Sequence, residues 1–444
     1  MLKVMLFICL IISTPLAGWL IEAVDTAGNT GKYTSITLDR NERPHISYMA
    51  WSPNTRSYNL KYANWTGSAW QIHVIDTTAD TAAYYNRKTS LALDAQDYPH
   101  IGYVRSRATR TRFVKYAKWD GVNWNFQEID TATGYGGIGM ALDQSGHPHM
   151  SYTKGPLMYA RHDGTRWIIQ KVDSMAITWF TAIALDHRGY PHISYLSGQL
   201  KYARWDGSSW LIEPIDSDPT AGQHISIALD TADRPQVSYL YQYSPTWLGL
   251  RCARRTDTGW IIEDIDLSDF GLDGATATAI KLNQAGFACI TYYNGPGRTN
   301  KYAYWDGSRW ITEAVFPQGL YSSLTLNRSD QPRIACYDYQ LADLIYAKWV
   351  ASIKEEKNLS NLNTPAFCIF PNPVQSILSI RFYKPPQSQA RLCLYNISGR
   401  KVKEMVSDRK HTILLNMKDL PSAVYFLKIE TEKKTVTEKI VVIK

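Results

Sequence analysis

The chain has 444 residues and a formal net charge of +8 at pH 7, from 48 Lys+Arg against 40 Asp+Glu. Residues 364–444 alone hold 14 basic and 6 acidic residues, so the rest of the chain is balanced at 34 against 34. A neutral main body argues against a protein that binds the phosphate backbone of nucleic acid. A basic tail on a neutral body predicts two parts with different tasks.

The first 18 residues have the pattern of a secretory signal peptide. Lys3 precedes an apolar run, Val4–Ile12, and small residues follow up to a cleavage point near Ala17 or Gly18. The run is too short to cross a membrane, and no later segment has the pattern of a transmembrane helix. We therefore expect residues 1–18 to be removed and the mature chain to have no membrane span.

Four short phrases then recur along the chain, and we call them A to D in chain order. They read Ser-Ile-x-Leu-Asp, Pro-His-Ile-Ser-Tyr, Leu-Lys-Tyr-Ala-x-Trp and Trp-x-Ile-x-x-Val/Ile-Asp, and all are rich in strand-forming residues. The Trp of phrase D recurs at spacings of 43 to 54 residues. Its positions are Trp19, Trp70, Trp124, Trp167, Trp210, Trp260 and Trp310. Repeats of this length with four strands each predict the blades of a β-propeller.

The seventh repeat lacks a D phrase of its own. Its A, B and C phrases lie at residues 323–327, 332–336 and 344–349, whereas the D phrase at residues 19–25 stands alone at the N-terminal end. An open ring would expose strand edges that recruit other chains, so we expect the lone phrase to complete the seventh blade. This closure resembles that of WD-repeat propellers, although their Gly-His and Trp-Asp signature does not occur in the sequence. The predicted fold is all-β, with a seven-bladed propeller over residues 19–350.

Length variation among the repeats falls on one side of the predicted ring. The A–B and C–D links keep constant lengths, whereas the B–C and D–A links vary and share one face, which we call the variable face. Loops on a rigid scaffold often carry binding residues, and aromatic rings stack on sugars. The candidate ligand-binding residues on this face are Trp51, Tyr84, Tyr85, Arg105, Arg107, Tyr135, Trp179, Trp247, Tyr293 and Tyr321.

These residues favour an extracellular binding module for carbohydrate or another polymer, and we expect a monomer. Arg105 and Arg107 belong to an arginine-rich link whose planar guanidinium groups suit carboxylate or sulfate. The link Trp119–Trp124 is similar to the Asp-box of sialidases, with one residue fewer between Asp and Gly. An enzyme acting on polysaccharide, a lyase or a sialidase-like hydrolase, is therefore an alternative, although no catalytic residue can be assigned. A structural scaffold that docks other proteins is a third hypothesis.

Metal sites were considered at two places. His45, His100, His149 and His192 occupy one repeat position in four different blades, so they cannot converge on one ion. We expect each to be hydrogen-bonded within its blade to the Asp that ends strand A. The loop Asp266–Gly274 has spaced carboxylates without the spacing of an EF-hand. No metal or cofactor is therefore expected, with calcium at this loop as the alternative.

Cysteine usage does not indicate a full disulfide framework. Cys252, Cys289 and Cys336 replace regular residues inside predicted strands, so we expect them to be buried as small apolar side chains. Cys368 and Cys393 lie on different strands of the tail, where a disulfide would be feasible.

Residues 351–364 are polar and predict a linker before a separate β domain at residues 365–444. This domain contains Phe370-Pro371-Asn372-Pro373, then Gly399-Arg400, then Tyr425, and it ends in the segment from Lys439 to Lys444. In this order the motifs resemble the type A C-terminal sorting domain of the type IX secretion system, also called the Por system. The resemblance implies an Ig-like sandwich, the type IX machinery as partner, and export across both membranes of a Gram-negative-type bacterium to the surface or the medium.

Overall fold

The computed structural model describes residues 18–54, 57–80, 89–106, 111–133, 137–174, 180–244, 247–267, 277–295, 299–350, 367–370, 374, 377–382, 389–396, 399–407, 412–430 and 435–442. Within these ranges the chain forms 35 strands in nine sheets and has no helix. The predicted all-β class is therefore confirmed. The expected signal peptide and linker lie outside the described residues, apart from Gly18, so their boundaries stay predictions.

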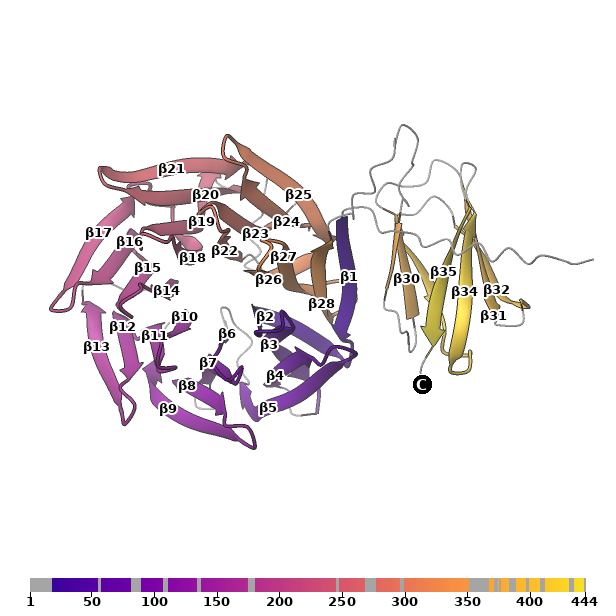
Figure 1. Ribbon diagram of the computed structural model, residues 1–444, viewed down its shortest axis with the longest axis horizontal. Coiled ribbons are helices and arrows are strands. Elements are labelled where there is room, and N and C mark those ends of the chain that lie inside the picture. Colours follow the sequence, from indigo (N-terminus) through magenta and orange to yellow (C-terminus); the bar gives the residue numbers. More distant parts are fainter. Residues whose placement is uncertain are drawn as a thin grey trace, which may run out of the picture. The chain divides into compact units, whose positions relative to one another are not determined.

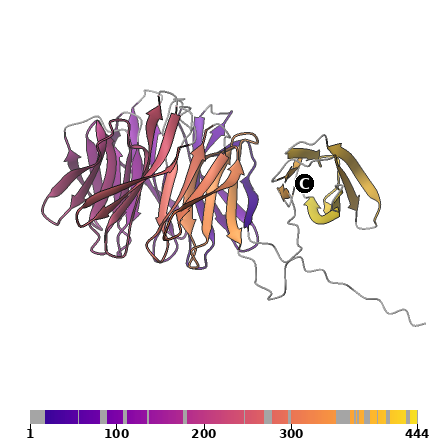
Figure 2. The same ribbon diagram turned by 90° about the horizontal axis from the view of Figure 1, so that it is seen from above.

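Seven four-stranded antiparallel sheets surround a central axis, as Figure 1 shows. The innermost strand of each blade packs against the innermost strand of the next, from β2 through β6, β10, β14, β18, β22 and β26, and back to β2. The four phrases of each repeat form the four strands of a blade, with strand A inside and strand D outside. The strands run between the two faces of the ring, which Figure 2 shows from the side.

The strand boundaries follow the repeat closely. Blades 1 to 3 consist of β2 (Asn29–Leu38), β3 (Pro44–Ser52), β4 (Ser57–Trp65) and β5 (Trp70–Asp80); β6 (Thr89–Leu93), β7 (Pro99–Ser106), β8 (Arg112–Trp119) and β9 (Trp124–Ala132); β10 (Ile138–Leu142), β11 (Pro148–Thr153), β12 (Leu157–His162) and β13 (Trp167–Asp173). Blades 4 to 6 consist of β14 (Thr181–Leu185), β15 (Pro191–Ser197), β16 (Gln199–Trp205) and β17 (Trp210–Asp216); β18 (Gln223–Leu229), β19 (Pro235–Ser244), β20 (Trp247–Thr256) and β21 (Gly259–Asp266); β22 (Thr278–Leu282), β23 (Ala288–Asn294), β24 (Thr299–Trp305) and β25 (Trp310–Pro317).

The seventh blade takes its outer strand from the N-terminal end of the propeller. Its sheet has the order β1 (Gly18–Asp25), β28 (Asp343–Val350), β27 (Pro332–Asp338) and β26 (Gly319–Leu326). The closure predicted from the lone D phrase is therefore confirmed. With β1 in place every blade has four strands, so no blade exposes the edge of its third strand.

A β-bulge near the end of strand D recurs in the blades and explains why two consecutive residues of phrase D are buried. In blade 1, Leu60 pairs with Asp76 and Lys61 pairs with Val74, so Ile75 is the additional residue. Ile75 is 8% exposed, and the Asp76 side chain is also buried. The bulge interrupts the alternation of a regular strand and aims the carboxylate at the next blade.

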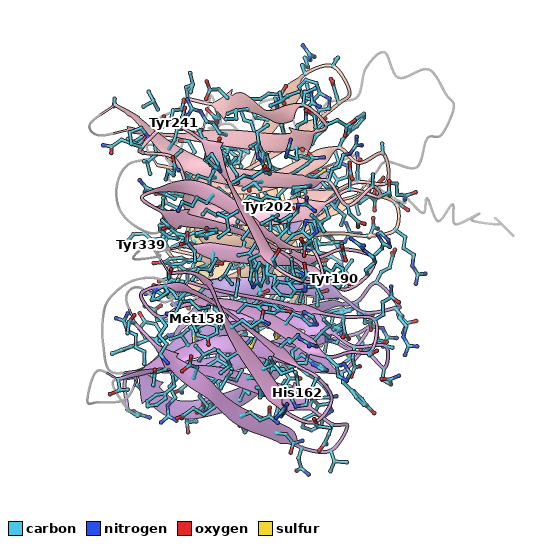
Figure 3. All side chains as sticks on the ribbon, turned by 90° about the vertical axis from the view of Figure 1, so that its left-hand side faces the viewer. Met158, His162, Tyr190, Tyr202, Tyr241 and Tyr339 are labelled. Atoms are coloured by element: carbon cyan, nitrogen blue, oxygen red, sulfur yellow. The ribbon has the colours of Figure 1, made fainter. Side chains whose placement is uncertain are left out.

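The face opposite the variable face consists of short turns whose polar groups are hydrogen-bonded within the turn. We call it the constant face. Asp39 Oδ1, for example, accepts hydrogen bonds from the backbone amides of Asn41 (2.8 Å) and Arg43 (2.7 Å). Neighbouring blades are also joined on this face. Arg40 Nε of blade 1, for example, donates a hydrogen bond to Asp97 Oδ2 of blade 2 at 2.9 Å. Figure 3 shows the ring from its rim, with Tyr190 toward this face and Tyr241 and Tyr339 toward the other.

The C-terminal domain is a sandwich of two antiparallel sheets. One sheet contains β29 (Phe367–Phe370), β30 (Ile377–Phe382) and β33 (Thr412–Asn416), and the other contains β32 (Lys401–Ser407), β31 (Ala390–Asn396), β34 (Ala423–Glu430) and β35 (Thr435–Val442). Apolar side chains of both sheets, such as Ile380 and Leu427, form one shared core. Cys393, in β31, is a buried free thiol, so it is not in a disulfide.

Candidate functional site

Neighbouring blades are held together by hydrogen bonds to a buried aspartate carboxylate, and we call this arrangement the carboxylate pin. The Asp residues that accept these bonds have a structural role. The Asp that ends strand D accepts hydrogen bonds from a Tyr of strand B and from a basic residue of the next blade, which lies in strand C or, for Lys154 of blade 3, in the B–C link. At the junction of blades 3 and 4, Asp173 Oδ2 lies 2.8 Å from Tyr195 Oη and 3.0 Å from Lys201 Nζ. Burial raises the pKa of Tyr195 far above its ordinary value, so its phenol keeps the proton that it donates.

Six of the seven junctions contain this carboxylate pin. The tyrosine–aspartate pairs are Tyr48–Asp25, Tyr103–Asp76, Tyr152–Asp130, Tyr195–Asp173, Tyr239–Asp216 and Tyr292–Asp266. At the junction of blades 6 and 7 the same three positions hold Phe316, Cys336 and Ile345, which are at most 1% exposed. An apolar group thus replaces the whole pin at that junction.

The four histidines of strand B have a structural role, as expected. His100 Nε2 lies 3.2 Å from Asp94 Oδ2, and its Nδ1 lies 2.6 Å from Tyr116 Oη. The bond to the Asp that ends strand A is therefore confirmed for His100, and the other three histidines lie 3.6–3.8 Å from the equivalent carboxylates. Burial lowers the pKa of His100 to about 4, so its imidazole is neutral at physiological pH.

On the variable face, aromatic side chains of blades 1 and 7 gather where the ring closes. The rings of Trp51 and Tyr58 meet edge to face at 5.1 Å, and the rings of Tyr33 and Tyr321 lie 4.4 Å apart across the two blades. The ring centroids of Tyr321 and Tyr337 are 6.3 Å apart. With one lysine, these side chains form what we call the seam patch: Lys32, Tyr33, Trp51, Tyr58, Tyr321 and Tyr337.

Lys32 supplies the positive charge of the seam patch. Its Nζ donates a hydrogen bond to Tyr58 Oη at 3.1 Å. The same ammonium group lies 5.4 Å from the ring centroid of Tyr58 and 5.2 Å from that of Tyr337, which is cation–π distance. The ammonium thereby links aromatic side chains that come from both blades.

Two tyrosines of the seam patch have strained backbones. Tyr33 and Tyr321 have φ values of 56° and 53°, in the left-handed region that costs a bulky residue about 1–2 kcal/mol. Each strained carbonyl is held by a threonine of the next blade: Thr89 Oγ1 donates to Tyr33 O at 3.0 Å, and Thr34 Oγ1 donates to Tyr321 O at 2.7 Å. His224 of blade 5 has the same geometry, with a φ of 54° and a hydrogen bond from Thr278 Oγ1 to its carbonyl at 2.6 Å, so this feature belongs to the repeat.

The structure brings two of the ten predicted ligand-binding residues, Trp51 and Tyr321, into this one patch. Arg105 lies in β7 of blade 2 and does not belong to the seam patch. Tyr293 differs from the prediction: β23 extends beyond it, so Tyr293 is only 1% exposed and packs with Leu320 and Tyr337 beneath the surface. The remaining predictions fall outside the described residues or side chains: Tyr84, Tyr85, Arg107, Tyr135, Trp179 and Trp247.

The ten predicted residues do not include four members of the seam patch, Lys32, Tyr33, Tyr58 and Tyr337. Lys32 lies before the recognisable part of phrase A, and Tyr337 follows the most degenerate copy of phrase B. Neither position stands out within its own repeat. Their proximity depends on the pairing of blade 1 with blade 7, which a scan along the chain does not display.

No cluster of three or more His, Cys, Asp or Glu residues that could hold a metal is found in the described part of the chain. Most of the loop considered for calcium, residues 268–276, lies outside that part. Asp266, at its beginning, is already bonded to Tyr292 Oη (2.7 Å) and Lys301 Nζ (2.8 Å). The described residues also include no helix of sufficient length and apolarity to span a membrane.

The sorting motifs that the structure describes have structural roles in the C-terminal domain. Gly399 has a φ of 76° in a tight turn, and Arg400 closes that turn through its backbone amide to Asn396 Oδ1 at 3.0 Å. Tyr425 is 2% exposed and donates from its Oη to the carbonyl of Pro421 at 3.0 Å. Phe370 ends β29 and Lys439 lies in β35, whereas Pro371, Asn372, Pro373 and Lys444 lie outside the described residues.

These features define the chain as a seven-bladed β-propeller joined to a small β-sandwich. Residues 368–444 match the family model described as the secretion system C-terminal sorting domain. The protein is therefore exported through the type IX secretion system to the cell surface or the extracellular space. No curated protein matches the chain.

Solved structures with a similar fold have low sequence identity. The BP39L lectin from Burkholderia pseudomallei is 13% identical, with a TM-score of 0.51, and the match covers 76% of this chain and 97% of that one. A lectin from Aleuria aurantia in complex with α-methyl-L-fucoside is 12% identical, with a TM-score of 0.45 and coverages of 65% and 96%. A protein of unknown function from Dyadobacter fermentans is 13% identical, with a TM-score of 0.45 and coverages of 67% and 99%. At such identities the likeness concerns the fold alone.

Proposed function

We propose that the exported propeller is a carbohydrate-binding module and that it binds its ligand on the variable face, centred on the seam patch. The observation that carries the proposal is the meeting of four partly exposed aromatic rings and one ammonium group on strand ends of two adjacent blades, packed against the buried Tyr337. Aromatic faces pack on the C–H faces of sugar rings, and the phenol and ammonium groups can exchange hydrogen bonds with hydroxyls. The shared fold with the BP39L lectin agrees with this class of function.

The rigid backbone of the seam patch supports the same proposal. The threonine bonds hold the carbonyl groups of Tyr33 and Tyr321 in place, as Thr278 Oγ1 holds that of His224 in blade 5. A rigid aromatic surface loses little conformational entropy when a ligand binds. The patch is therefore suited to an extracellular polymer that presents flat, apolar ring faces.

A glycan-array measurement on the full secreted chain tests this proposal. Wild-type protein is compared with Tyr58→Ala, which removes a ring of the seam patch, and with Tyr304→Ala. Tyr304 is a matched control because it is also a half-buried tyrosine on a C strand, at the constant-face end of blade 6. We expect specific glycan signals that fall about tenfold or more in Tyr58→Ala only. Equal signals in both variants, or no glycan signal for the wild type, would contradict the proposal.

One observation favours the enzyme hypothesis as a second candidate. Asp343 begins β28 beside the seam, and burial together with the charges of Asp338 and Asp25 raises its pKa to about 7. A carboxylic acid that keeps its proton near neutral pH can act as a general acid in glycoside cleavage. We would measure the release of reducing ends from polysaccharides that score on the array. Cleavage that disappears in Asp343→Asn would support an enzyme, and the absence of cleavage by the wild type would leave a binding module.

A further inference from the structure

A cleft opens between blades 4 and 5 on the constant face, away from the seam patch. It has a volume of about 580 Å³, which lies in the range of small-molecule sites. Its walls come from the ends of β16 and β17 in blade 4 and from the A–B and C–D turns of blade 5. Tyr202, which lines the cleft, is labelled in Figure 3 and marks the position of β16.

The repeat departs from its own pattern at this cleft. In blade 4 the Trp that ends phrase C packs on the Trp that begins phrase D, with 5.4 Å between the centroids of Trp205 and Trp210. Blade 5 has Arg255 at the position of Trp205. The Arg255 guanidinium turns to blade 4, where it bonds to Glu213 with Nε–Oε1 at 2.8 Å and Nη2–Oε2 at 3.3 Å. A blade with the regular repeat would have an indole ring at this position. With the planar guanidinium group of Arg255 there instead, the cleft stays open.

Glu213 is fixed from a second side. Trp260 Nε1 donates to Glu213 Oε1 at 2.9 Å, in addition to the two bonds from Arg255. The equivalent residues of the two preceding blades, Gln127 and Gln170, accept only from the Trp of the next blade. Glu213 and Arg255 therefore bring opposite charges together at the junction that contains the cleft. Local departures of this kind from an otherwise consistent repeat are typical of functional sites.

One cation of the cleft has no partner of its own. Three of its arginines are engaged: Arg188 with Asp186 at 3.6 Å, Arg234 with Asp230 at 2.8 Å, and Arg255 with Glu213. The side chain of Arg204 is exposed and makes neither a hydrogen bond nor an ion pair with any described residue. Its fork of N–H donors is thus available to an anionic group, which it would bind in a bidentate manner.

The other residues that line the cleft indicate which chemical groups the ligand has besides its anionic group. Trp205 is half-buried and Leu211 is 41% exposed, so both offer apolar surface beside Arg204. Asp233 and Asp257 lie across the cleft and can accept hydrogen bonds from hydroxyl groups. A carboxylic acid without hydroxyl groups would have no hydrogen-bond donor for the carboxylates of Asp233 and Asp257. A sugar ring with one acidic substituent satisfies all three features.

We propose that this cleft is a second binding site, for a saccharide unit that carries a carboxylate or a sulfate group. The acidic group pairs with Arg204, the apolar face of the ring lies against Trp205 and Leu211, and hydroxyls donate to Asp233 or Asp257. The site lies on the constant face, so it goes beyond the proposed function and does not require the seam patch to bind anything. A chain with both sites would hold a polymer at two separate points.

The test is a calorimetric titration of the full secreted chain, because its 15 Trp residues would mask a change in the fluorescence of Trp205. Wild-type protein is titrated with glucuronate, with glucose 6-sulfate and with glucose. We expect the acidic sugars to bind, glucose to bind at least about tenfold more weakly, and added salt to weaken the acidic ligands only. The two acidic probes distinguish the carboxylate from the sulfate. Equal binding of glucose, or no response to any of the three, would overturn the proposal.

Two variants separate the cleft from general charge effects. Arg204→Ala should weaken the acidic sugars about tenfold or more, and Arg204→Lys should recover part of the loss. Arg161→Ala is the matched control, because Arg161 has the same repeat position in blade 3 and is also exposed. An equal loss in Arg161→Ala would overturn the site. Arg255→Trp restores the residue of the regular repeat and should fill the cleft, with loss of acidic-sugar binding but retention of any glycan signal that depends on Tyr58.

Discussion

Blades 1–4 repeat one set of polar side chains, whereas blades 5–7 replace that set in several places. Each of the first four blades has a buried His at the start of strand B, and the later blades have Gln236, Cys289 and Arg333 at that position. At the junction of blades 6 and 7 the carboxylate pin becomes the apolar group around Phe316. The repeated polar residues therefore belong to the framework of the ring. Both binding proposals involve the less regular half: the seam patch uses blade 7 and the cleft uses blade 5.

The replaced pin shows that polar and apolar junctions are alternative solutions to the same packing problem. Its three positions lie in three strands of two blades, and all three change together at one junction. A single change would leave a buried charge or hydroxyl without its partner, which is costly, whereas a complete exchange need not be. Variants that change one member of a pin, or all of its members, test whether the two kinds of junction are interchangeable.

The largest effect is expected when one member of a pin is removed. Asp173→Ala leaves the ammonium group of Lys201 and the phenol of Tyr195 buried without their acceptor, and we expect a loss of about 3–5 kcal/mol in the free energy of unfolding. All 15 Trp residues lie before residue 350, so urea denaturation followed by Trp fluorescence reports the propeller alone. Asp173→Asn keeps an acceptor and should lose less. A loss below about 1 kcal/mol for the alanine variant would mean that the pin does not hold the junction.

A smaller effect, which depends on pH, is expected from the histidines of the regular half. The folded pKa of His100 is about 4, below the ordinary value of 6.5, because of burial beside Tyr116 and Lys118 and despite the charge of Asp94. Between these two pH values the unfolded chain binds a proton that the folded chain does not. The stability that His100 contributes is therefore complete above pH 6.5 and is lost as the pH falls toward 4, by up to about 3 kcal/mol.

The pH effect is measured by comparing urea midpoints at pH 8 and pH 4.5. His100→Gln, which introduces the residue that blade 5 has at this position, should show a shallower loss of stability on acidification than the wild type. The pKa of Asp94 is also lowered, so its own contribution is lost only at more acidic pH. Identical pH profiles for the two proteins would show that the imidazole is not held neutral by burial.

The smallest stability change is expected when a whole pin is exchanged. The triple variant Asp173→Phe, Tyr195→Cys and Lys201→Ile copies the junction of blades 6 and 7 into the junction of blades 3 and 4. Because no charge or hydroxyl remains without a partner, the triple variant should be within about 1.5 kcal/mol of the wild type in urea denaturation. If it is as unstable as Asp173→Ala, the two kinds of junction are not interchangeable.

The architecture of this propeller could be predicted from the sequence because every blade carries the information for its own strands. The hairpin links, the constant turns and the lone D phrase at Trp19 were sufficient to predict seven blades and their closure. The carboxylate pins could not be predicted, because the bulge at Ile75 and the contact of Asp76 with Tyr103 depend on how one blade faces the next. The Asp that ends strand D is an inter-blade acceptor, and its place at the end of a phrase does not indicate this role.

The candidate site was predicted only in part, for a related physical reason. Trp51 and Tyr321 stood out as aromatics beside variable links, and both lie in the seam patch. Tyr293 has the same sequence character, yet one further residue of strand pairing carries it into the core. Lys32 gains its role from rings of another blade. Residue type and loop length thus indicated two members of the seam patch, but the set of contacting side chains required the folded ring.

The most direct test of the central claim is a calorimetric titration of the full secreted chain with the strongest glycan from the array. Trp51→Ala and Trp65→Ala are measured beside the wild type. Both tryptophans are half-buried in blade 1 and meet another ring edge to face, at opposite ends of the blade. Binding on the variable face predicts an affinity loss of about tenfold or more in Trp51→Ala and wild-type affinity in Trp65→Ala. Unchanged affinity in Trp51→Ala, or an equal loss in both variants, would contradict it.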